Sequence, residues 1–66
     1  MNVIINGSIN SINTNITVID LLQQLGSQNQ KIAVELNEEI ISRSEYPKKI
    51  IFENDKIEII QAIGGG

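Results

Sequence analysis

The feature that most constrains the fold is a short amphipathic helix predicted between residues 17 and 26. Thr17 can act as the N-cap, and Asp20 occupies the acidic position of a capping box three residues later. Gly26 stands where many helices end in a left-handed residue. Four aliphatic side chains share one helical face: Val18, Leu21, Leu22 and Leu25. We therefore predict a helix from about Val18 to Leu25 that buries one face.

Apolar residues elsewhere in the chain largely alternate with polar ones, as in strands that are buried on one side. Asn6 and Gly7 predict a tight hairpin turn, because both central positions of that turn require positive φ. The uneven spacing of Ile9 and Ile12 predicts a bulge or a frayed edge in the strand after this turn. The expected strands cover residues 1–6, 8–13, 32–36, 39–41 and 56–63.

The stretch before the last strand is polar and contains the single proline, Pro47. We interpret residues 42–49 as a long connection with room for one helical turn, and residues 50–52 as a return to the core. The order of elements predicts an α+β class in which one helix covers one face of a sheet. A single domain is expected over residues 1–63, followed by a flexible glycine tail over residues 64–66.

The small size of the chain and the absence of cysteine and histidine exclude most kinds of catalytic site. A domain of 66 residues buries only about 60% of its unfolded surface, which leaves little room for an internal cavity. Without thiols or imidazoles, the chain lacks a thiol nucleophile, the usual general base and the commonest metal ligands. We therefore expect no enzyme activity, no metal site and no bound cofactor, and we expect function at the surface or at an end.

The charge and hydropathy of the chain exclude further kinds of partner. Its formal net charge of −3 argues against the basic surface that nucleic-acid binding requires. No apolar run approaches the length that spans a membrane, and no cationic and apolar signal segment begins the chain. We therefore expect neither nucleic acid nor membrane as a partner, and a location in the cytoplasm or, for an organellar gene, in the stroma.

Three glycines, Gly64, Gly65 and Gly66, follow a strongly apolar strand at the end of the sequence. Glycine has no Cβ, so such a run can pass through a channel too narrow for other residues, and its carboxyl carbon is open to attack. A terminal carboxylate is an anion at neutral pH and must be activated before a nucleophile can attack it. We interpret this terminus as the candidate reactive group.

The order of several short motifs resembles one known family. These motifs are Thr17–Leu22, Val34–Asn37, Ile40–Arg43, Asn54–Ile60 and the glycine end. Together they resemble the ThiS sulfur carriers of thiamin biosynthesis, which are ubiquitin-like proteins. The resemblance covers essentially the whole chain and implies a β-grasp fold, with a mixed four- to five-stranded sheet and one main helix packed on one face.

The resemblance also implies a chemistry for the terminus. The Gly66 carboxylate would be adenylated with ATP by an adenylyltransferase of the ubiquitin-activating type (ThiF-like). A sulfur-donating enzyme would then convert it to a thiocarboxylate, which would supply a thiazole synthase (ThiG-like) with sulfur for the thiazole part of thiamin. In this scheme Gly64 and Gly65 let the tail thread into a partner, and ATP is used by that partner rather than bound by the carrier.

The implied fold places the first and last strands side by side in the middle of the sheet. Ile4, Ile60 and Ala62 would then lie together on the face away from the helix. We expect these three residues to form a docking patch for a partner, although single exposed aliphatic residues are common.

Three other functions remain open from the sequence. A molybdopterin-synthase small subunit resembles the same fold and tail but is generally longer. A ubiquitin-like protein modifier would join its glycine end to lysines of target proteins. A β-grasp interaction module would use the fold without the tail, because a fold does not fix a function.

Two groups of charged residues are interpreted as solvated surface rather than as sites. The acidic group is Glu53, Asp55 and Glu58, and the basic group is Arg43, Lys48 and Lys49. Charged residues around turns are usually exposed to water, so we favour this reading over a metal or anion site.

Overall fold

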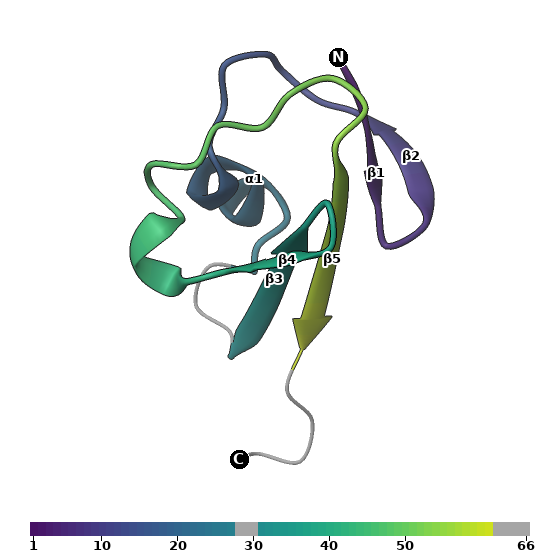
Figure 1. The fold of residues 1–66 in the computed structure, drawn as a ribbon. Helices are drawn as coiled ribbons and strands as arrows, with labels where there is room; N and C mark the ends of the chain where they lie inside the picture. The colour runs from purple at the N-terminus through teal and green to yellow at the C-terminus, as the bar shows by residue number, and fades with distance from the viewer. Residues whose placement is uncertain (28–30, 62–66) are drawn as a thin grey trace.

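The computed structural model describes residues 1–27 and 31–61. Within these residues the chain forms a five-stranded sheet, one α-helix and one short 3-10 turn (Figure 1). The strands are β1 (Asn2–Ile5), β2 (Ser8–Ser11), β3 (Ile32–Leu36), β4 (Glu39–Ile41) and β5 (Lys56–Gln61). The helix is α1 (Val18–Gln24), and the 3-10 turn is η1 (Arg43–Glu45).

The strands follow the order β2-β1-β5-β3-β4, so β5 lies in the middle of the sheet. The pair β1 and β5 is parallel, whereas β2 with β1, β3 with β5 and β3 with β4 are antiparallel. The α+β class and the mixed sheet with one helix on one face are thereby confirmed.

Both hairpins turn through residues with positive φ. Asn6 and Gly7 have φ values of 48° and 83°, as the predicted turn requires, and Asn37 and Glu38 have values of 52° and 70°. The pairing of β1 with β2 is unbroken from Asn2↔Ser11 to Ile5↔Ser8. The predicted bulge is therefore absent from the paired residues, and β2 is a regular strand at the edge of the sheet that ends at Ser11.

The ends of α1 are fixed by the residues that the sequence indicated. The Thr17 N–H donates to Asp20 Oδ2 (2.9 Å), and the Asp20 N–H donates to Thr17 Oγ1 (3.3 Å), which completes the capping box. At the other end Gly26 has a φ of 71°, and the Ser27 N–H donates to the Leu22 carbonyl (2.8 Å). This is a Schellman ending, which satisfies carbonyl groups of the last turn.

The core lies between α1 and one face of the sheet. Its buried side chains are Val3, Ile5, Ile16, Val18, Leu21, Leu22, Val34, Leu36, Tyr46, Ile51 and Ile57. Two expectations need correction here. Leu25 is 47% exposed, because it lies past the end of α1 as the C-cap. In residues 50–52 only Ile51 is buried, because side chains of an extended segment alternate and its neighbours face outward.

Candidate functional site

The strand that leads to the glycine tail is held on both sides. On one side β5 pairs with β3 from Leu36↔Ile57 to Ile32↔Gln61. On the other side β5 pairs in parallel with β1, with Ile4 opposite Lys56 and Ile5 opposite Ile57. Gln61, the last described residue, is therefore still paired within the sheet.

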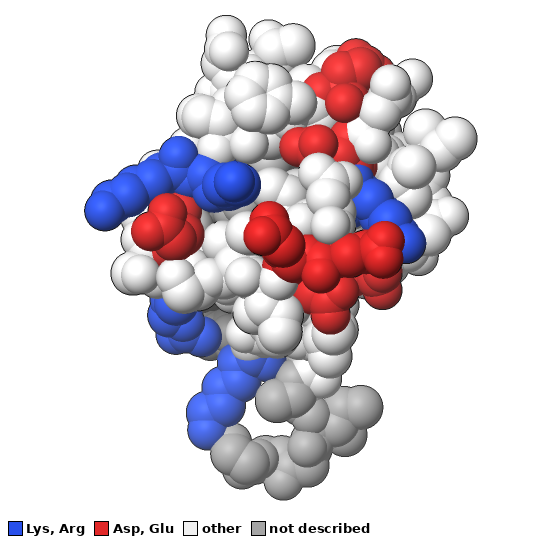
Figure 2. Space-filling model, in the orientation of Figure 1, with Lys and Arg blue, Asp and Glu red and all other residues white. Residues whose placement is uncertain are grey.

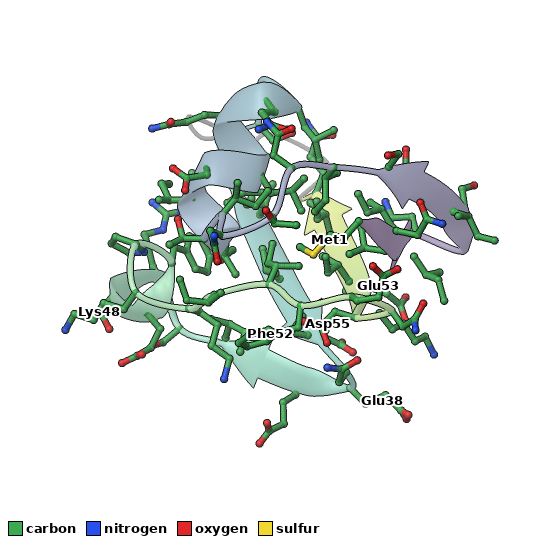
Figure 3. The ribbon with its side chains drawn as sticks, turned by 90° about the horizontal axis from the view of Figure 1, so that it is seen from above. Met1, Glu38, Lys48, Phe52, Glu53 and Asp55 are labelled. Atoms are coloured by element: carbon green, nitrogen blue, oxygen red, sulfur yellow. The ribbon has the colours of Figure 1, made fainter. Side chains whose placement is uncertain are left out.

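Asn37, in the turn between β3 and β4, anchors the beginning of β5. Its side-chain Oδ1 accepts from the Lys56 N–H (2.9 Å), and its Nδ2 donates to Asp55 Oδ1 (3.0 Å). Its backbone N–H also donates to the Lys56 carbonyl (2.7 Å). The second oxygen of Asp55 accepts from the Phe52 N–H (2.8 Å), and these two residues lie side by side in Figure 3. The turn before β5 is thus fixed by side chains.

Asn6, in the turn between β1 and β2, holds β5 nearer to its end. Backbone bonds join the Ile4 N–H to the Asp55 carbonyl and the Asn6 N–H to the Ile57 carbonyl (both 2.9 Å). One step further along, Asn6 Oδ1 accepts from the Ile59 N–H (2.8 Å), and its Nδ2 donates to the Ile59 carbonyl (3.4 Å). The amide side chain therefore continues the hydrogen-bond ladder where the backbone of β1 has turned away.

Sequence reasoning assigned neither role. The pair Asn6 and Gly7 indicates a turn, but the partner of the Asn6 side chain lies 53 residues away. The signal that was available is chemical: an asparagine amide carries the same donor and acceptor as a peptide group.

A shallow hollow of about 290 Å³ lies where β3 begins and β5 ends. It is lined by Lys31, Ile32, Ala33, Arg43 and Ile60. Ile60 is 52% exposed, so this surface combines accessible apolar area with two basic side chains. Basic side chains are visible at the lower end of the molecule in Figure 2, which is the end where β5 finishes in Figure 1.

Of the site residues predicted from the sequence, Ala62, Gly64, Gly65 and Gly66 lie outside the described residues. Ile4 and Ile60 lie on the outer face of the sheet, away from α1, but they are not neighbours. Because β1 meets β5 at Lys56, Glu58 intervenes between the two isoleucines on that face. Ile4 lines a second hollow of about 110 Å³, with Asn2, Val3, Ile9 and Asn54.

The acidic residues near the last turn serve the structure. Glu53 Oε2 accepts from the Asn2 N–H (3.0 Å), and Asp55 holds the turn as described above. Glu58 lies 3.9 Å from the Lys56 ammonium group, and both side chains are about half exposed. Across residues 1–27 and 31–61, no group of three or more acidic, histidine or cysteine side chains could hold a metal ion.

Of the basic group, Arg43 lines the same hollow as Lys31, so it belongs to the end of the sheet near the tail. No helix in the described part of the chain is long and apolar enough to cross a membrane.

Comparisons with known proteins agree with this geometry. The model of the ThiS family matches residues 3–66. A thiazole synthase from Paramagnetospirillum magneticum is 41% identical over 66 residues, which cover 100% of this chain and 20% of that protein. The sulfur carrier protein ThiS of Bacillus subtilis is 38% identical over 50 residues, which cover 76% of each chain. The chain thus spans about a fifth of the thiazole synthases that it matches and three quarters of the carrier.

Among solved structures, the crystal structure of the thiamine biosynthesis protein ThiS from Geobacter metallireducens superimposes with a TM-score of 0.86. The two sequences are 29% identical, and the match covers 100% of both chains. The β-grasp fold that the sequence predicted is confirmed by this match.

Proposed function

The chain belongs to the ThiS family, and from this membership we propose that it is a sulfur carrier for the biosynthesis of the thiazole part of thiamin. The observation that carries the proposal is the family match, which extends through the glycines to Gly66. The relatives named as ThiS sulfur carriers support the same reading. The carrier is a co-substrate on which partner enzymes act, and it supplies no catalytic residue of its own.

The reacting group in this proposal is the carboxylate of Gly66. The carboxylate oxygen attacks the α-phosphorus of ATP and releases pyrophosphate, which gives an acyl-adenylate. Sulfur delivered at the oxidation level of hydrosulfide then attacks the carboxyl carbon, and AMP leaves with the electron pair of its bond to that carbon, so that the product is a thiocarboxylate. Activation is required because the free carboxylate is an anion at neutral pH and resists attack.

Gly64 and Gly65 provide the clearance for this chemistry. Three extended residues span about 10 Å, enough to reach through a short collar of protein. The absence of Cβ atoms lets a narrow channel close around the backbone. A larger side chain at Gly65 would therefore hinder entry into a partner without altering the domain.

The proposed partners are an adenylyltransferase of the ubiquitin-activating type, a sulfur-donating enzyme and a thiazole synthase, acting in the cytoplasm. Two matched relatives are named thiazole synthase and contain a segment like this chain, which supports the last of these partners. We propose that two residues before the glycines contribute to docking. These are Ile60, which lies on β5, and Ala62, which follows β5 in the sequence. Ile4 contributes from a separate hollow on the same face.

The proposal is tested with purified protein, ATP and an adenylyltransferase of the ubiquitin-activating type. Pyrophosphate release should depend on the carrier and should disappear when Gly65 and Gly66 are deleted. The truncated protein should unfold at the same denaturant concentration, because the buried cluster runs only from Val3 to Ile57. That control separates loss of the reacting group from loss of the fold.

The second measurement is the intact mass of the protein isolated from cells that make thiamin. A fraction of molecules should be heavier by the exchange of one oxygen for one sulfur at Gly66. The proposal is wrong if no such species occurs and the truncated carrier still supports growth without thiamin.

A further inference from the structure

The turn between β1 and β2 contains a chemically reactive pair of residues. Asn6 is the only asparagine of the sequence that is followed by glycine. The backbone nitrogen of a residue can attack the side-chain amide carbon of a preceding asparagine, and glycine hinders this attack least because it has no Cβ. Both residues are exposed. In the described part of the chain, nothing except the immediate neighbours lies within 4 Å of the place that a Cβ on Gly7 would occupy.

The fold holds the Asn6 amide away from the Gly7 nitrogen. Strand β1 lies between β2 and β5, so the chain leaves Asn6 toward β2 while its side chain reaches the opposite neighbour, β5 (Figure 1). There Oδ1 accepts from the Ile59 N–H (2.8 Å) and Nδ2 donates to the Ile59 carbonyl (3.4 Å). These bonds must break before the amide carbon can approach Gly7. The closed turn therefore slows the attack, and opening of the turn permits it.

Strand β2 offers little resistance to such an opening. All four of its residues are exposed, so burial of apolar surface contributes little to holding them in place. The buried cluster in the described part of the chain includes Val3 of β1 and Ile57 of β5 but no residue of β2. Segments with few buried contacts open at a lower free energy than the molecule as a whole. The turn can therefore open while the core stays folded.

We propose that Asn6 is a site of spontaneous deamidation in the folded protein, and that the reaction weakens the hold on β5 at Ile59. The Gly7 nitrogen gives up its proton and attacks Asn6 Cγ, and Nδ2 takes up a proton and leaves as ammonia, which closes a succinimide ring. Water then opens the ring. Attack of water at Cγ gives aspartate, whereas attack at the main-chain carbonyl carbon gives isoaspartate, in which the chain continues through Cγ. One water is consumed for each ammonia released.

Each product weakens the hold of residue 6 on Ile59. Aspartate keeps an acceptor for the Ile59 N–H, but a carboxylate oxygen replaces Nδ2 and has no proton to donate to the Ile59 carbonyl. In isoaspartate the former amide carbon becomes part of the main chain, so the amide no longer reaches β5. The additional backbone atom also lengthens a two-residue turn that sets the register of its hairpin. The end of β5 is therefore held less firmly, most of all in the isoaspartate form.

The chain contains a matched control in the turn between β3 and β4. Asn37 and Glu38 have φ values of 52° and 70°, close to the 48° and 83° of Asn6 and Gly7. Asn37 is also exposed, and its side chain also bonds β5, at the Lys56 N–H (2.9 Å). The difference is the side chain of Glu38, which hinders attack by the backbone nitrogen. Asn37 should therefore stay intact while Asn6 is converted.

The test is incubation of the full chain in mildly alkaline buffer, which favours the deprotonated backbone nitrogen, followed by mass spectrometry. Trypsin separates the two asparagines into residues 1–31 and residues 32–43. Fragmentation should locate the exchange of an amino group for a hydroxyl at Asn6 and none at Asn37, and electron-transfer fragmentation should identify both products. The capped peptide acetyl-Ile-Ile-Asn-Gly-Ser-Ile-amide should be converted about five-fold faster or more, the equilibrium factor for one hydrogen bond.

Two variants test the role of the residue that follows asparagine. Glu38→Gly should make Asn37 reactive, because glycine accepts the positive φ and removes the obstructing side chain. Gly7→Ala should slow the conversion of Asn6 several-fold. Alanine is strained at this φ, so unchanged amide signals of core residues verify the fold, and Glu38→Gly decides the matter if Gly7→Ala does not fold.

The effect on β5 is measured on the isoaspartate form, which ion exchange separates from the parent by its additional negative charge. Hydrogen exchange at the Ile59 amide should be about five-fold faster than in the parent. The amide of Glu58 should change much less, because neighbouring residues of a strand alternate in direction and this amide faces β3.

Urea concentrations below the unfolding transition distinguish the local route from global unfolding. The rate at Asn6 should change little, because opening of the turn exposes little surface. A rate that rises in proportion to the unfolded fraction would overturn the proposal. So would conversion at Asn6 no greater than at Asn37 once the peptide is fully converted, or an isoaspartate form whose Ile59 amide exchanges as in the parent. The proposal does not rest on the chemistry at Gly66, so failure of either leaves the other standing.

Discussion

Two asparagine side chains in this protein form hydrogen bonds to β5 at positions where the neighbouring backbone has turned away from that strand. Asn6 and Asn37 both adopt the left-handed conformation, which asparagine tolerates better than most residues. Each then uses its amide to bond β5, Asn37 at Lys56 and Asn6 at Ile59. One residue type therefore makes the turn and also completes the ladder of the central strand.

The role of Asn6 is tested by Asn6→Gly, because glycine accepts the positive φ but has no amide. The free energy of unfolding should fall by about 1 kcal/mol, the typical net contribution of such bonds. Hydrogen exchange at the Ile59 amide should accelerate more than exchange at Ile57. Asn15→Gly is the matched control, since Asn15 also has positive φ, at 60°, and should change stability by no more than about 0.5 kcal/mol. Equal losses in both variants would contradict the bridging role.

At the scale of elements, α1 stabilises the domain through three of the four aliphatic positions of its predicted stripe, Val18, Leu21 and Leu22. Leu21 and Leu22 are both 1% exposed and belong to the buried cluster. Leu25 has the correct helical spacing but lies beyond the last helical residue. Its side chain is therefore outside the layer that packs on the sheet.

The contrast between two leucines of the same segment gives a direct test. Leu22→Ala should lower the free energy of unfolding by about 2–5 kcal/mol, because it leaves a cavity in the core. Leu25→Ala should cost less than about 1 kcal/mol, because its side chain is half in water already. Chemical denaturation of both variants measures the difference. A cost for Leu25→Ala near that of Leu22→Ala would show that Leu25 packs in solution.

Elements defined by local signals could be predicted from the sequence. The capping box of Thr17 and Asp20, the turn at Asn6 and Gly7, and the alternation of residues 32–36 each act within a few residues. The exposure of Ile50 and Phe52 could not be predicted, because it depends on how an irregular segment passes the core. The separation of Ile4 from Ile60 depends on the register between β1 and β5, which no local pattern specifies. The glycine site itself stays a prediction.

The molecule as a whole presents one outer sheet face with distinct regions. The hollow that includes Ile60 lies near the exit of the tail, whereas the hollow that includes Ile4 and Ile9 lies next to β2. Glu58 separates them along β5, and Glu35 stands opposite it on β3. Under the function proposed above, Ile60 is the nearer of the two isoleucines to the end of β5, where a partner would bind.

This arrangement predicts different effects for two exposed isoleucines. Ile60→Lys should raise the KM for the carrier in the adenylation assay by about ten-fold, which corresponds to about 1.4 kcal/mol of binding. Ile40→Lys, at a more exposed position on the distant edge strand, should leave the KM unchanged. Both variants should unfold as the parent does. A parental KM for Ile60→Lys would exclude this residue from docking.

The central place of β5 has a mechanical consequence. A partner that pulls on the chain beyond Gln61 applies force along β5, parallel to the strand and across its bonds to β3. Such a force is shared by several hydrogen bonds, which are loaded in shear and do not open one after another. They are the backbone bonds to β3, the bond from the Ile59 N–H to the Asn6 side chain and the bond from the Lys56 N–H to the Asn37 side chain. Traction on that end is therefore resisted at once by the hydrogen bonds of β5 to both of its neighbouring strands.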